Sequence, residues 1–150
     1  MFNVFYPQVV FQEVPDEVSL AFTVSGCPIG CKGCHSKATW NADDGTPLSE
    51  DRFNELLLKY QGLITCVLFF GGEWHPQTLF RMLKIARAQG LKTCLYTGAD
   101  NIGEQLKSVL TYLKTGPWKA ALGGLDSPTT NQRFIDLRSH QSLNYRFIRT

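Results

Sequence analysis

The stretch VSLAFTVSGCPIGCKGC, residues 18–34, decides how this chain of 150 residues is expected to fold. Its first eight residues are mostly β-branched or apolar and stop at Gly-Cys-Pro, a pattern that indicates a buried strand. Three cysteines follow within eight residues, Cys27, Cys31 and Cys34, with the spacing C-x3-C-x2-C. The loop that holds them, residues 26–48, is long for a compact domain, and loops of that length are usually functional.

Outward from this stretch, strand-like and helix-like segments alternate along the chain. Helices are predicted after the N-cap residue Ser49, from Pro76 to about Gly90, and over residues 101–114. Further strands are predicted at residues 64–70, 91–97, 118–122 and 143–148. Strands that alternate with helices favour parallel units with right-handed crossovers, so an α/β fold with mainly parallel strands is expected.

Length and composition limit the classes of protein to which the chain can belong. The length corresponds to a single domain, residues 1–150. The net charge of +2 is too small to argue for nucleic acid. The longest purely apolar stretch, residues 66–70, is too short to span a membrane, and no secretory signal is recognised, so a cytoplasmic protein is expected. Five cysteines in a reducing compartment favour metal ligands over disulfides.

The cysteine spacing suits an iron–sulfur cluster. Three thiolates on a short loop with Gly30 and Gly33 can wrap one [4Fe-4S] cube, and one iron then keeps an open position, which is typical of catalysis. A zinc site completed by His35, Cys66 or Cys94 stays open as an alternative. Cys66 and Cys94 lie in apolar strands, where cysteine is usually a small buried hydrophobe.

A second motif, Gly71-Gly72-Glu73, follows the second predicted strand. Because the carboxyl ends of parallel strands share one edge of a sheet, this motif and the cysteine loop are predicted to converge. Two glycines let a backbone approach a ligand closely, and Glu73 offers an anionic acceptor to an ammonium group. Thr97 and Gly98 end the third predicted strand and either contact the same ligand or make a turn.

The cysteine spacing after a first strand resembles the signature of the radical S-adenosylmethionine superfamily, and Gly-Gly-Glu resembles the second motif of that superfamily. The resemblance implies a [4Fe-4S] cluster with S-adenosylmethionine bound beside it, the amino group of its methionine moiety on Glu73. His35 could stack on the adenine or hydrogen-bond it. The residues implied as ligands are Cys27, Cys31 and Cys34 for the cluster, and Gly71, Gly72, Glu73, His35, Thr97 and Gly98 for S-adenosylmethionine.

A closer resemblance is to the family of anaerobic ribonucleoside-triphosphate reductase activating proteins. The segments that carry it are Ser25-Gly26-Cys27, Cys31-x-Gly33-Cys34, Lys37-Ala38-Thr39-Trp40, Gly71-Gly72-Glu73 with His75-Pro76, Tyr96-Thr97-Gly98, Gly123-Gly124-Leu125, Ser127 and Asn131-Gln132-Arg133. The chain departs from the family at His35, where a tyrosine is usual, at Phe70, and in residues 12–17, which lack a Gly-Pro-Gly run. Whether residues 131–133 line the site or cap the chain locally stays open.

This resemblance implies a function and partners. The family cleaves S-adenosylmethionine reductively and generates a glycyl radical on anaerobic ribonucleoside-triphosphate reductase. The implied partners are the glycyl-radical subunit of that reductase and a low-potential electron donor such as flavodoxin, with no nucleic acid and no membrane. A full barrel of eight βα units takes ~250 residues. A partial, open and shortened βα barrel is therefore expected, whose open side would admit a peptide loop of the partner.

Two other functions stay open from the sequence. One is a radical S-adenosylmethionine enzyme that acts on a small molecule, similar to those of the queuosine pathway, which would need a closed substrate pocket. The other is a non-catalytic iron–sulfur or zinc module, which would cleave no S-adenosylmethionine and would give Glu73 no role.

Overall fold

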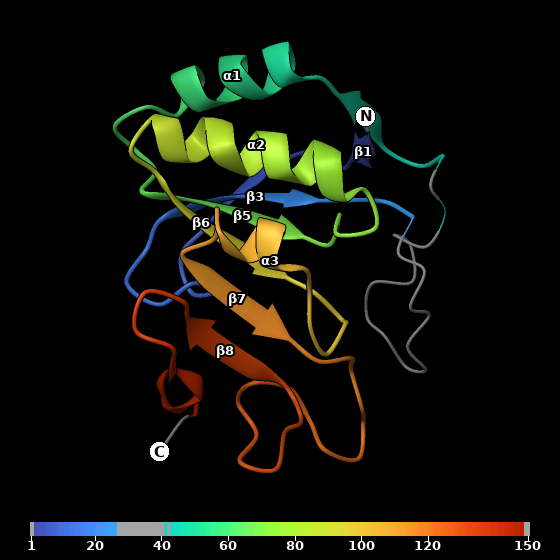
Figure 1. Cartoon of the computed structure of the whole chain (residues 1–150), viewed down its shortest axis with the longest axis vertical. Coiled ribbons are helices and arrows are strands. Elements are labelled where there is room, and N and C mark those ends of the chain that lie inside the picture. Colours follow the sequence, from blue (N-terminus) through green and yellow to red (C-terminus); the bar gives the residue numbers. More distant parts are fainter. Residues whose placement is uncertain (1, 27–40, 42, 149–150) are drawn as a thin grey trace.

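The computed structural model describes residues 2–26, 41 and 43–148. Within these residues the centre of the molecule is a sheet of seven strands in the order β2-β3-β5-β6-β7-β8-β9 (Figure 1). The strands are β2 (Gln8–Val10), β3 (Ser19–Thr23), β5 (Cys66–Phe70), β6 (Lys92–Tyr96), β7 (Tyr112–Thr115), β8 (Arg133–Asp136) and β9 (Gln141–Ser142). Strands β3, β5, β6 and β7 run parallel, while β2, β8 and β9 pair antiparallel. A separate ribbon pairs β1 (Phe2–Val4) with β4 (Thr46–Leu48).

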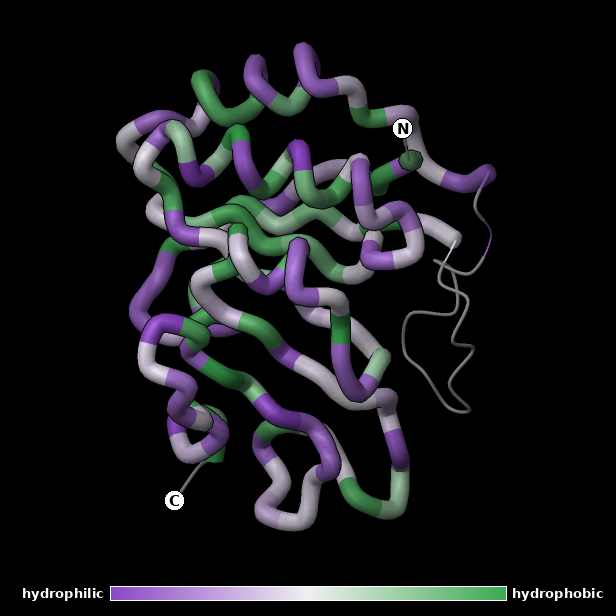
Figure 2. The backbone as a smooth tube through the Cα atoms, viewed as in Figure 1, coloured by the Kyte–Doolittle hydropathy of each residue, from purple (hydrophilic) through white to green (hydrophobic). Residues whose placement is uncertain are grey.

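Helices α1 (Glu50–Lys59), α2 (Pro76–Ala88) and the short α3 (Glu104–Lys107) pack on one face of this sheet (Figure 1). Ser49 caps α1 as predicted, because its side chain accepts a hydrogen bond from the backbone N–H of Arg52 at 3.0 Å. Apolar residues at helical spacing bury this face: Phe53, Leu56 and Leu57 of α1 and Leu79, Met82 and Leu83 of α2 pack with Phe22, Phe69 and Leu95 of the strands. Figure 2 shows hydrophobic residues concentrated along these central strands.

The opposite face of the sheet, here called the inner face, carries a second apolar cluster but no α-helix among the described residues. Its buried members are Val14, Ala21, Cys66, Leu68, Cys94, Tyr112, Leu125 and Phe134. Two irregular segments supply part of the cover, residues 11–17 through Val14 and the end of the described chain through Phe147. Leu125, in the loop between β7 and β8, adds to this cover, so irregular segments rather than α-helices close the inner face.

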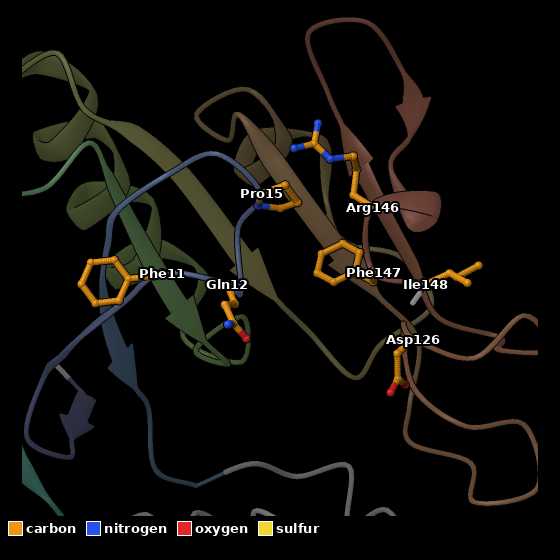
Figure 3. A pocket seen from close by; sticks show the side chains of 7 residues that line it. All are labelled: Phe11, Gln12, Pro15, Asp126, Arg146, Phe147 and Ile148. Atoms are coloured by element: carbon orange, nitrogen blue, oxygen red, sulfur yellow. The ribbon is translucent and has the colours of Figure 1, made fainter. Parts of the chain in front are cut away.

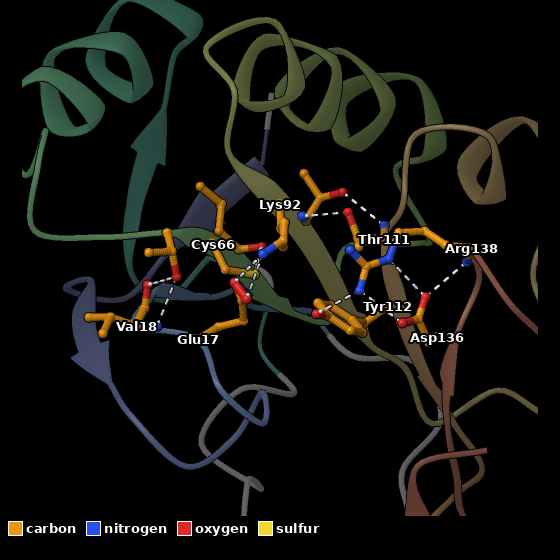
Figure 4. A network of polar contacts seen from close by, with 11 residues as sticks. Glu17, Val18, Cys66, Lys92, Thr111, Tyr112, Asp136 and Arg138 are labelled. Carbon is orange, nitrogen blue, oxygen red and sulfur yellow. Dashed lines mark hydrogen bonds and ion pairs between the residues drawn. The ribbon is translucent and has the colours of Figure 1, made fainter. Parts of the chain in front are cut away.

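Two ion pairs lie at the end of the sheet where the parallel strands begin (Figure 4). Lys92, the first residue of β6, donates to both carboxylate oxygens of the buried Glu17, at 3.0 and 3.1 Å. Arg138 forms a 2.8 Å ion pair with Asp136 and also donates to the hydroxyl of Tyr112, the first residue of β7. The charges at this end therefore have partners within the protein.

One predicted helix is wrong in its extent. The helix predicted over residues 101–114 is only α3, and its last part is strand β7, which pairs parallel with β6. The side chains of Thr93 and Thr111 accept hydrogen bonds from each other's backbone N–H groups, at 3.1 and 3.2 Å. These contacts join residues 18 positions apart, so tertiary pairing decides the state of a segment whose local pattern is helical.

Two predicted strands are also wrong. Residues 118–122 form turns, and residues 143–148 contain the 3-10 helix η2 (Asn144–Arg146). Strands β8 and β9, which pair antiparallel, complete this side of the sheet, so the sheet is mixed and the expectation of mainly parallel strands does not hold. Pro117 cannot donate to a sheet ladder, which favours a loop directly after β7. None of the helices in the described parts of the chain is long and apolar enough to cross a membrane.

Candidate functional site

The Gly-Gly-Glu motif forms the turn at the carboxyl end of β5. Gly71 and Gly72 both have left-handed backbone conformations, with φ of +84° and +106°. A Cβ atom on Gly71 would lie 2.5 Å from Cη2 of Trp74, and one on Gly72 would lie 3.2 Å from Cγ2 of Val24. Glycine is therefore required here by the turn and by packing within the protein, a reason that the sequence pattern did not indicate.

The residues that follow β3 and lead to the cysteine segment lie beside this turn. Strands β3 and β5 are parallel neighbours, and the backbone N–H of Val24 donates to the carbonyl of Phe70 at 3.0 Å. The chain thus lies beside the Gly-Gly-Glu turn as far as Val24, and the convergence of the cysteine loop itself stays a prediction. Cys27, Cys31, Cys34 and His35 lie outside the described residues, so their roles stay predictions.

Glu73 is held at this edge with one oxygen engaged and one unengaged. Its Oε1 accepts a hydrogen bond from the hydroxyl of Thr97 at 2.6 Å, and Thr97 Oγ1 in turn accepts from the backbone N–H of Ala99 at 3.0 Å. Glu73 Oε2 is buried and has no hydrogen-bond partner among the described residues. Burial raises the pKa of Glu73, and the Thr97 hydrogen bond and the charge of Lys114 partly oppose that rise. The predicted site residues Thr97 and Glu73 therefore form one unit, with Gly98 next to it in the chain.

Lys114 lies close enough for its charge to act on Glu73, and the sequence analysis did not single it out. It pairs in register with Tyr96, and its ammonium lies 5.7 Å from the centroid of the Tyr96 ring and 3.2 Å from the carbonyl oxygen of Gly116. Side chains alternate along a strand, and Tyr112 belongs to the inner-face cluster, so Lys114 also lies on the inner face. A lysine in the inward register of a strand would have been a signal, but only after residues 112–115 were recognised as a strand.

The segment Asn131-Gln132-Arg133 braces the loop after β7. Asn131 Nδ2 donates to the carbonyl of Pro117 at 3.1 Å, and Gln132 Nε2 donates to that of Gly116 at 3.4 Å. Arg133 donates to the backbone carbonyls of Thr130 and Gln132, both at 2.8 Å. Hydrogen bonds to nearby backbone carbonyls therefore account for most of the polar side-chain atoms in this segment.

A separate hollow of about 440 Å³ opens between the two segments that cross the inner face (Figure 3). The residues that line it are Phe11, Gln12 and Pro15 on one side and Asp126, Arg146, Phe147 and Ile148 on the other. An ion pair of 2.7 Å between Arg146 and Asp16 joins the two segments. The hollow carries both apolar and charged groups.

The two remaining cysteines behave as the sequence predicts. Cys66 and Cys94 are completely buried in β5 and β6 and form no disulfide. Burial raises the pKa of the Cys66 thiol to about 12 and also raises that of Cys94, so both thiols stay protonated. Among the described residues no group of three or more His, Cys, Asp or Glu side chains could hold a metal ion.

Comparison with known proteins places these features in context. Residues 17–116 match the protein family described as "4Fe-4S single cluster domain". The pyruvate formate-lyase-activating enzyme of Clostridium pasteurianum is 33% identical over 91 residues, which cover 55% of this chain and 38% of that enzyme. The anaerobic ribonucleoside-triphosphate reductase-activating protein of Escherichia coli K12 is 35% identical over 71 residues, which cover 43% of this chain and 44% of that protein. The chain thus spans less than half the length of the curated relatives it matches.

The matched segment includes the residues described above. Residues 17–116 contain the three clustered cysteines, the Gly-Gly-Glu turn, Thr97 and Lys114. The hollow beside Phe147 and the bracing segment at residues 131–133 lie largely beyond that match.

Proposed function

This chain belongs to the 4Fe-4S single cluster domain family, and on that basis we propose that it is a radical S-adenosylmethionine activating enzyme. A [4Fe-4S] cluster and S-adenosylmethionine are the cofactors that the family and the two activating relatives support. In this proposal the chain generates a glycyl radical on a partner enzyme, anaerobic ribonucleoside-triphosphate reductase, with electrons from a low-potential donor such as flavodoxin.

The observation that carries the proposal is the unengaged carboxylate oxygen of Glu73. A buried acceptor without a partner costs about 1–3 kcal/mol, so a ligand that donates to it gains that amount back. An ammonium group is a suitable donor, and Thr97 fixes the other oxygen so that the carboxylate keeps its orientation. These residues fit the amino group of S-adenosylmethionine.

Lys114 completes a pair of opposite charges at the same edge. Burial raises the pKa of Glu73, and the positive charge of Lys114 is the smallest of the influences that act in the opposite direction. A methionine end carries an ammonium and a carboxylate, which match Glu73 and Lys114 respectively. We assign Gly71, Gly72 and Gly98 to the turns that bring these side chains to the ligand, and His35 to the adenine.

The cluster belongs to the cysteine segment in this proposal. Cys27, Cys31 and Cys34 would hold three of its irons and leave the fourth open to S-adenosylmethionine. The cluster and S-adenosylmethionine supply one-electron cleavage of a carbon–sulfur bond and the removal of a hydrogen atom from the substrate. The residues of the chain bind and orient the methionine end.

The sheet suits a substrate that is itself a protein segment. We propose that the central strands form part of an open, shortened βα barrel whose inner face receives a peptide loop of the partner. The hollow between the two segments that cross the inner face is partly apolar, as a peptide site would be.

The test is anaerobic reconstitution with iron and sulfide, followed by dithionite and S-adenosylmethionine. Release of methionine and deoxyadenosine is expected, and Glu73→Gln should reduce it while Glu104→Gln, a change at a fully solvated side chain, should not. A protein that assembles the cluster but releases neither product, even with partner present, would contradict the proposal and favour a non-catalytic iron–sulfur module.

The choice of partner is tested separately. The relatives activate two different enzymes, and the motifs around Tyr96 and residues 123–133 favour the reductase. Each enzyme is incubated with the reduced, loaded protein, and the glycyl radical is measured by electron paramagnetic resonance. A radical on pyruvate formate-lyase alone would contradict the reductase assignment but not the activity.

A further inference from the structure

The loop between β7 and β8 begins at the carboxyl end of the parallel strands (Figure 1). Its hydroxyl groups donate to the backbone of the same loop. The hydroxyls of Ser127 and Thr129 both donate to the carbonyl of Leu122 at 2.9 Å. The hydroxyl of Thr130 donates to the carbonyl of Gly123, also at 2.9 Å. These three hydroxyl donors are therefore satisfied within the loop.

The side-chain oxygen of Asn131, near the end of this loop, is not satisfied in this way. Asn131 Nδ2 donates to the carbonyl of Pro117 at 3.1 Å, and this bond sets the orientation of the amide, because the reverse orientation would bring two oxygens together. Asn131 Oδ1 is buried, and no other buried side-chain atom of this loop lacks a hydrogen-bond partner among the described residues. A buried acceptor without a donor costs free energy, and a ligand that donates to it recovers that cost.

Hydrogen bonds connect Asn131 to Glu73 along this edge of the sheet. The hydroxyl of Thr97 donates to Glu73 Oε1 at 2.6 Å, and the backbone N–H of Ala99 donates to Thr97 Oγ1 at 3.0 Å. The backbone N–H of Gly116 donates to the carbonyl of Ala99 at 2.8 Å, and the residue after Gly116 is the one whose carbonyl Asn131 bonds. One connected row therefore carries both unpartnered oxygens, Glu73 Oε2 and Asn131 Oδ1.

The length of this row suits one part of S-adenosylmethionine. Glu73 follows β5, and the carbonyl that Asn131 bonds follows β7, so two strand spacings, roughly 10 Å, separate the ends of the row. An extended S-adenosylmethionine molecule holds its ribose hydroxyls at a comparable distance from its ammonium group, and its adenine amino group lies farther away.

We propose that Asn131 is a binding residue for S-adenosylmethionine, and that its Oδ1 accepts a hydrogen bond from a ribose hydroxyl while Glu73 holds the ammonium group. The inference rests on the function proposed above, and Asn131 lies outside the matched segment, residues 17–116. The bond to Pro117 already fixes the amide, so little freedom is lost when the ligand binds. A site with such an acceptor rejects a ligand that lacks the hydroxyl, because the oxygen then stays buried and unpaired.

The experiment compares the Kd of S-adenosylmethionine with those of its 2′-deoxy and 3′-deoxy analogues. Binding to the cluster-loaded protein is measured by anaerobic equilibrium dialysis without reductant. One neutral hydrogen bond corresponds to about a three- to tenfold change in Kd, so the wild type should bind one of the two analogues that much more weakly. Asn131→Ala should weaken S-adenosylmethionine by the same factor and leave the Kd of that analogue unchanged. Equal wild-type affinities for all three ligands would overturn the inference, and this comparison needs no variant that folds.

Gln132→Ala is the matched control, because Gln132 Nε2 also donates to a backbone carbonyl after β7, that of Gly116, at 3.4 Å. Loss of a structural contact should change the Kd of every ligand by one common factor, and this is the result expected for Gln132→Ala. The same result for Asn131→Ala would show that Asn131 only stabilises the loop, and would overturn the inference. Iron content and thermal unfolding verify that each variant is loaded and folded.

A further analogue, which lacks the adenine amino group, distinguishes the two donors of the nucleoside. If Asn131→Ala leaves the Kd of this analogue unchanged but weakens both deoxy analogues, Asn131 Oδ1 pairs with adenine and the ribose assignment is wrong. If Asn131 contacts the ribose, Asn131→Ala should weaken this analogue as much as it weakens S-adenosylmethionine.

The outcomes also separate this inference from the function on which it rests. A loaded wild-type protein that binds no S-adenosylmethionine would overturn both. A wild-type protein that binds S-adenosylmethionine and both deoxy analogues equally well would overturn only the role of Asn131.

Discussion

Replacement of Glu73 by glutamine isolates the charge that the site depends on. Glutamine keeps an oxygen to accept the 2.6 Å hydrogen bond from Thr97, but it places an NH₂ group where Oε2 stands unengaged. An ammonium ligand would then lose a charge-assisted hydrogen bond and meet a donor instead of an acceptor. Hydrogen bonds to charged groups contribute roughly 1.5–3 kcal/mol, so the Kd of S-adenosylmethionine should rise about 10- to 150-fold.

The same change should not weaken the protein without its ligand. Burial disfavours the ionised form of Glu73, as its raised pKa indicates, and a neutral glutamine avoids that cost. We therefore expect equal iron content and a Tm equal to or above that of the wild type. Equilibrium dialysis against labelled S-adenosylmethionine measures the effect, with Glu104→Gln as the control, since that side chain is 89% exposed. A Kd within twofold of the wild-type value would refute the assignment of the ammonium to Glu73.

Three further outcomes are expected. Because the pKa of Glu73 is raised in the folded protein, its protonation stabilises the fold below the usual glutamate pKa, and this stabilisation is lost as pH rises through the raised value. The affinity for S-adenosylmethionine should rise over the same pH interval. Glu73→Gln should abolish both trends, measured by chemical denaturation and by equilibrium dialysis at a series of pH values. Cys66→Ala and Cys94→Ala should each retain full iron content, measured by colorimetric assay, at a cost of about 1–2 kcal/mol in urea unfolding; loss of the cluster in either would show that a strand cysteine is a ligand. Lys92→Met should destabilise the protein by about 3 kcal/mol, because it leaves the carboxylate of Glu17 buried without its partner, while the Kd of S-adenosylmethionine stays constant; an equally stable variant would show that the ion pair contributes little.

The parts of the fold that the sequence predicted are those with local signals. The cap at Ser49, the proline that begins α2 and the apolar runs of β3, β5 and β6 each lie within a short window, and each element formed where it was expected. The ribbon of β1 and β4 was missed because strands of three residues carry too little pattern.

The errors lie where pairing over distance overrides the local pattern. Leu106, Leu110 and Leu113 share a helical spacing, yet Leu113 reaches the same helix-side cluster from strand β7. An apolar residue at that position satisfies either conformation, and only the ladder to β6 distinguishes them. Once β7 was assigned to a helix, the inward direction of Lys114 could not be deduced.

The sequence could predict those parts of the candidate site that depend only on the parallel order of the strands. The meeting of the end of β3, the Gly-Gly-Glu turn and Thr97 follows from strands that end at one edge, and the described residues show it through Val24. The hydrogen bond between Thr97 and Glu73, and the bond from Tyr96 to Glu13, depend on side-chain geometry that no sequence pattern contains. The ligand roles of the three clustered cysteines remain predictions.

The two ends of the sheet differ in a way that bears on function. Where the parallel strands begin, the charges of Glu17, Lys92 and Arg138 are engaged in ion pairs. Of the five buried side-chain atoms without a hydrogen-bond partner in the described residues, those of Glu73, Trp74 and Asn131 follow the carboxyl ends of strands or flank the loop after β7. Ser19 lies at the other end of the sheet, and Glu13 lies in a segment that crosses the inner face. Each such atom costs free energy that a well-packed structural region would avoid, and a ligand with matching groups can recover it. The uneven distribution therefore supports ligand binding at the Glu73 edge independently of any likeness to other proteins.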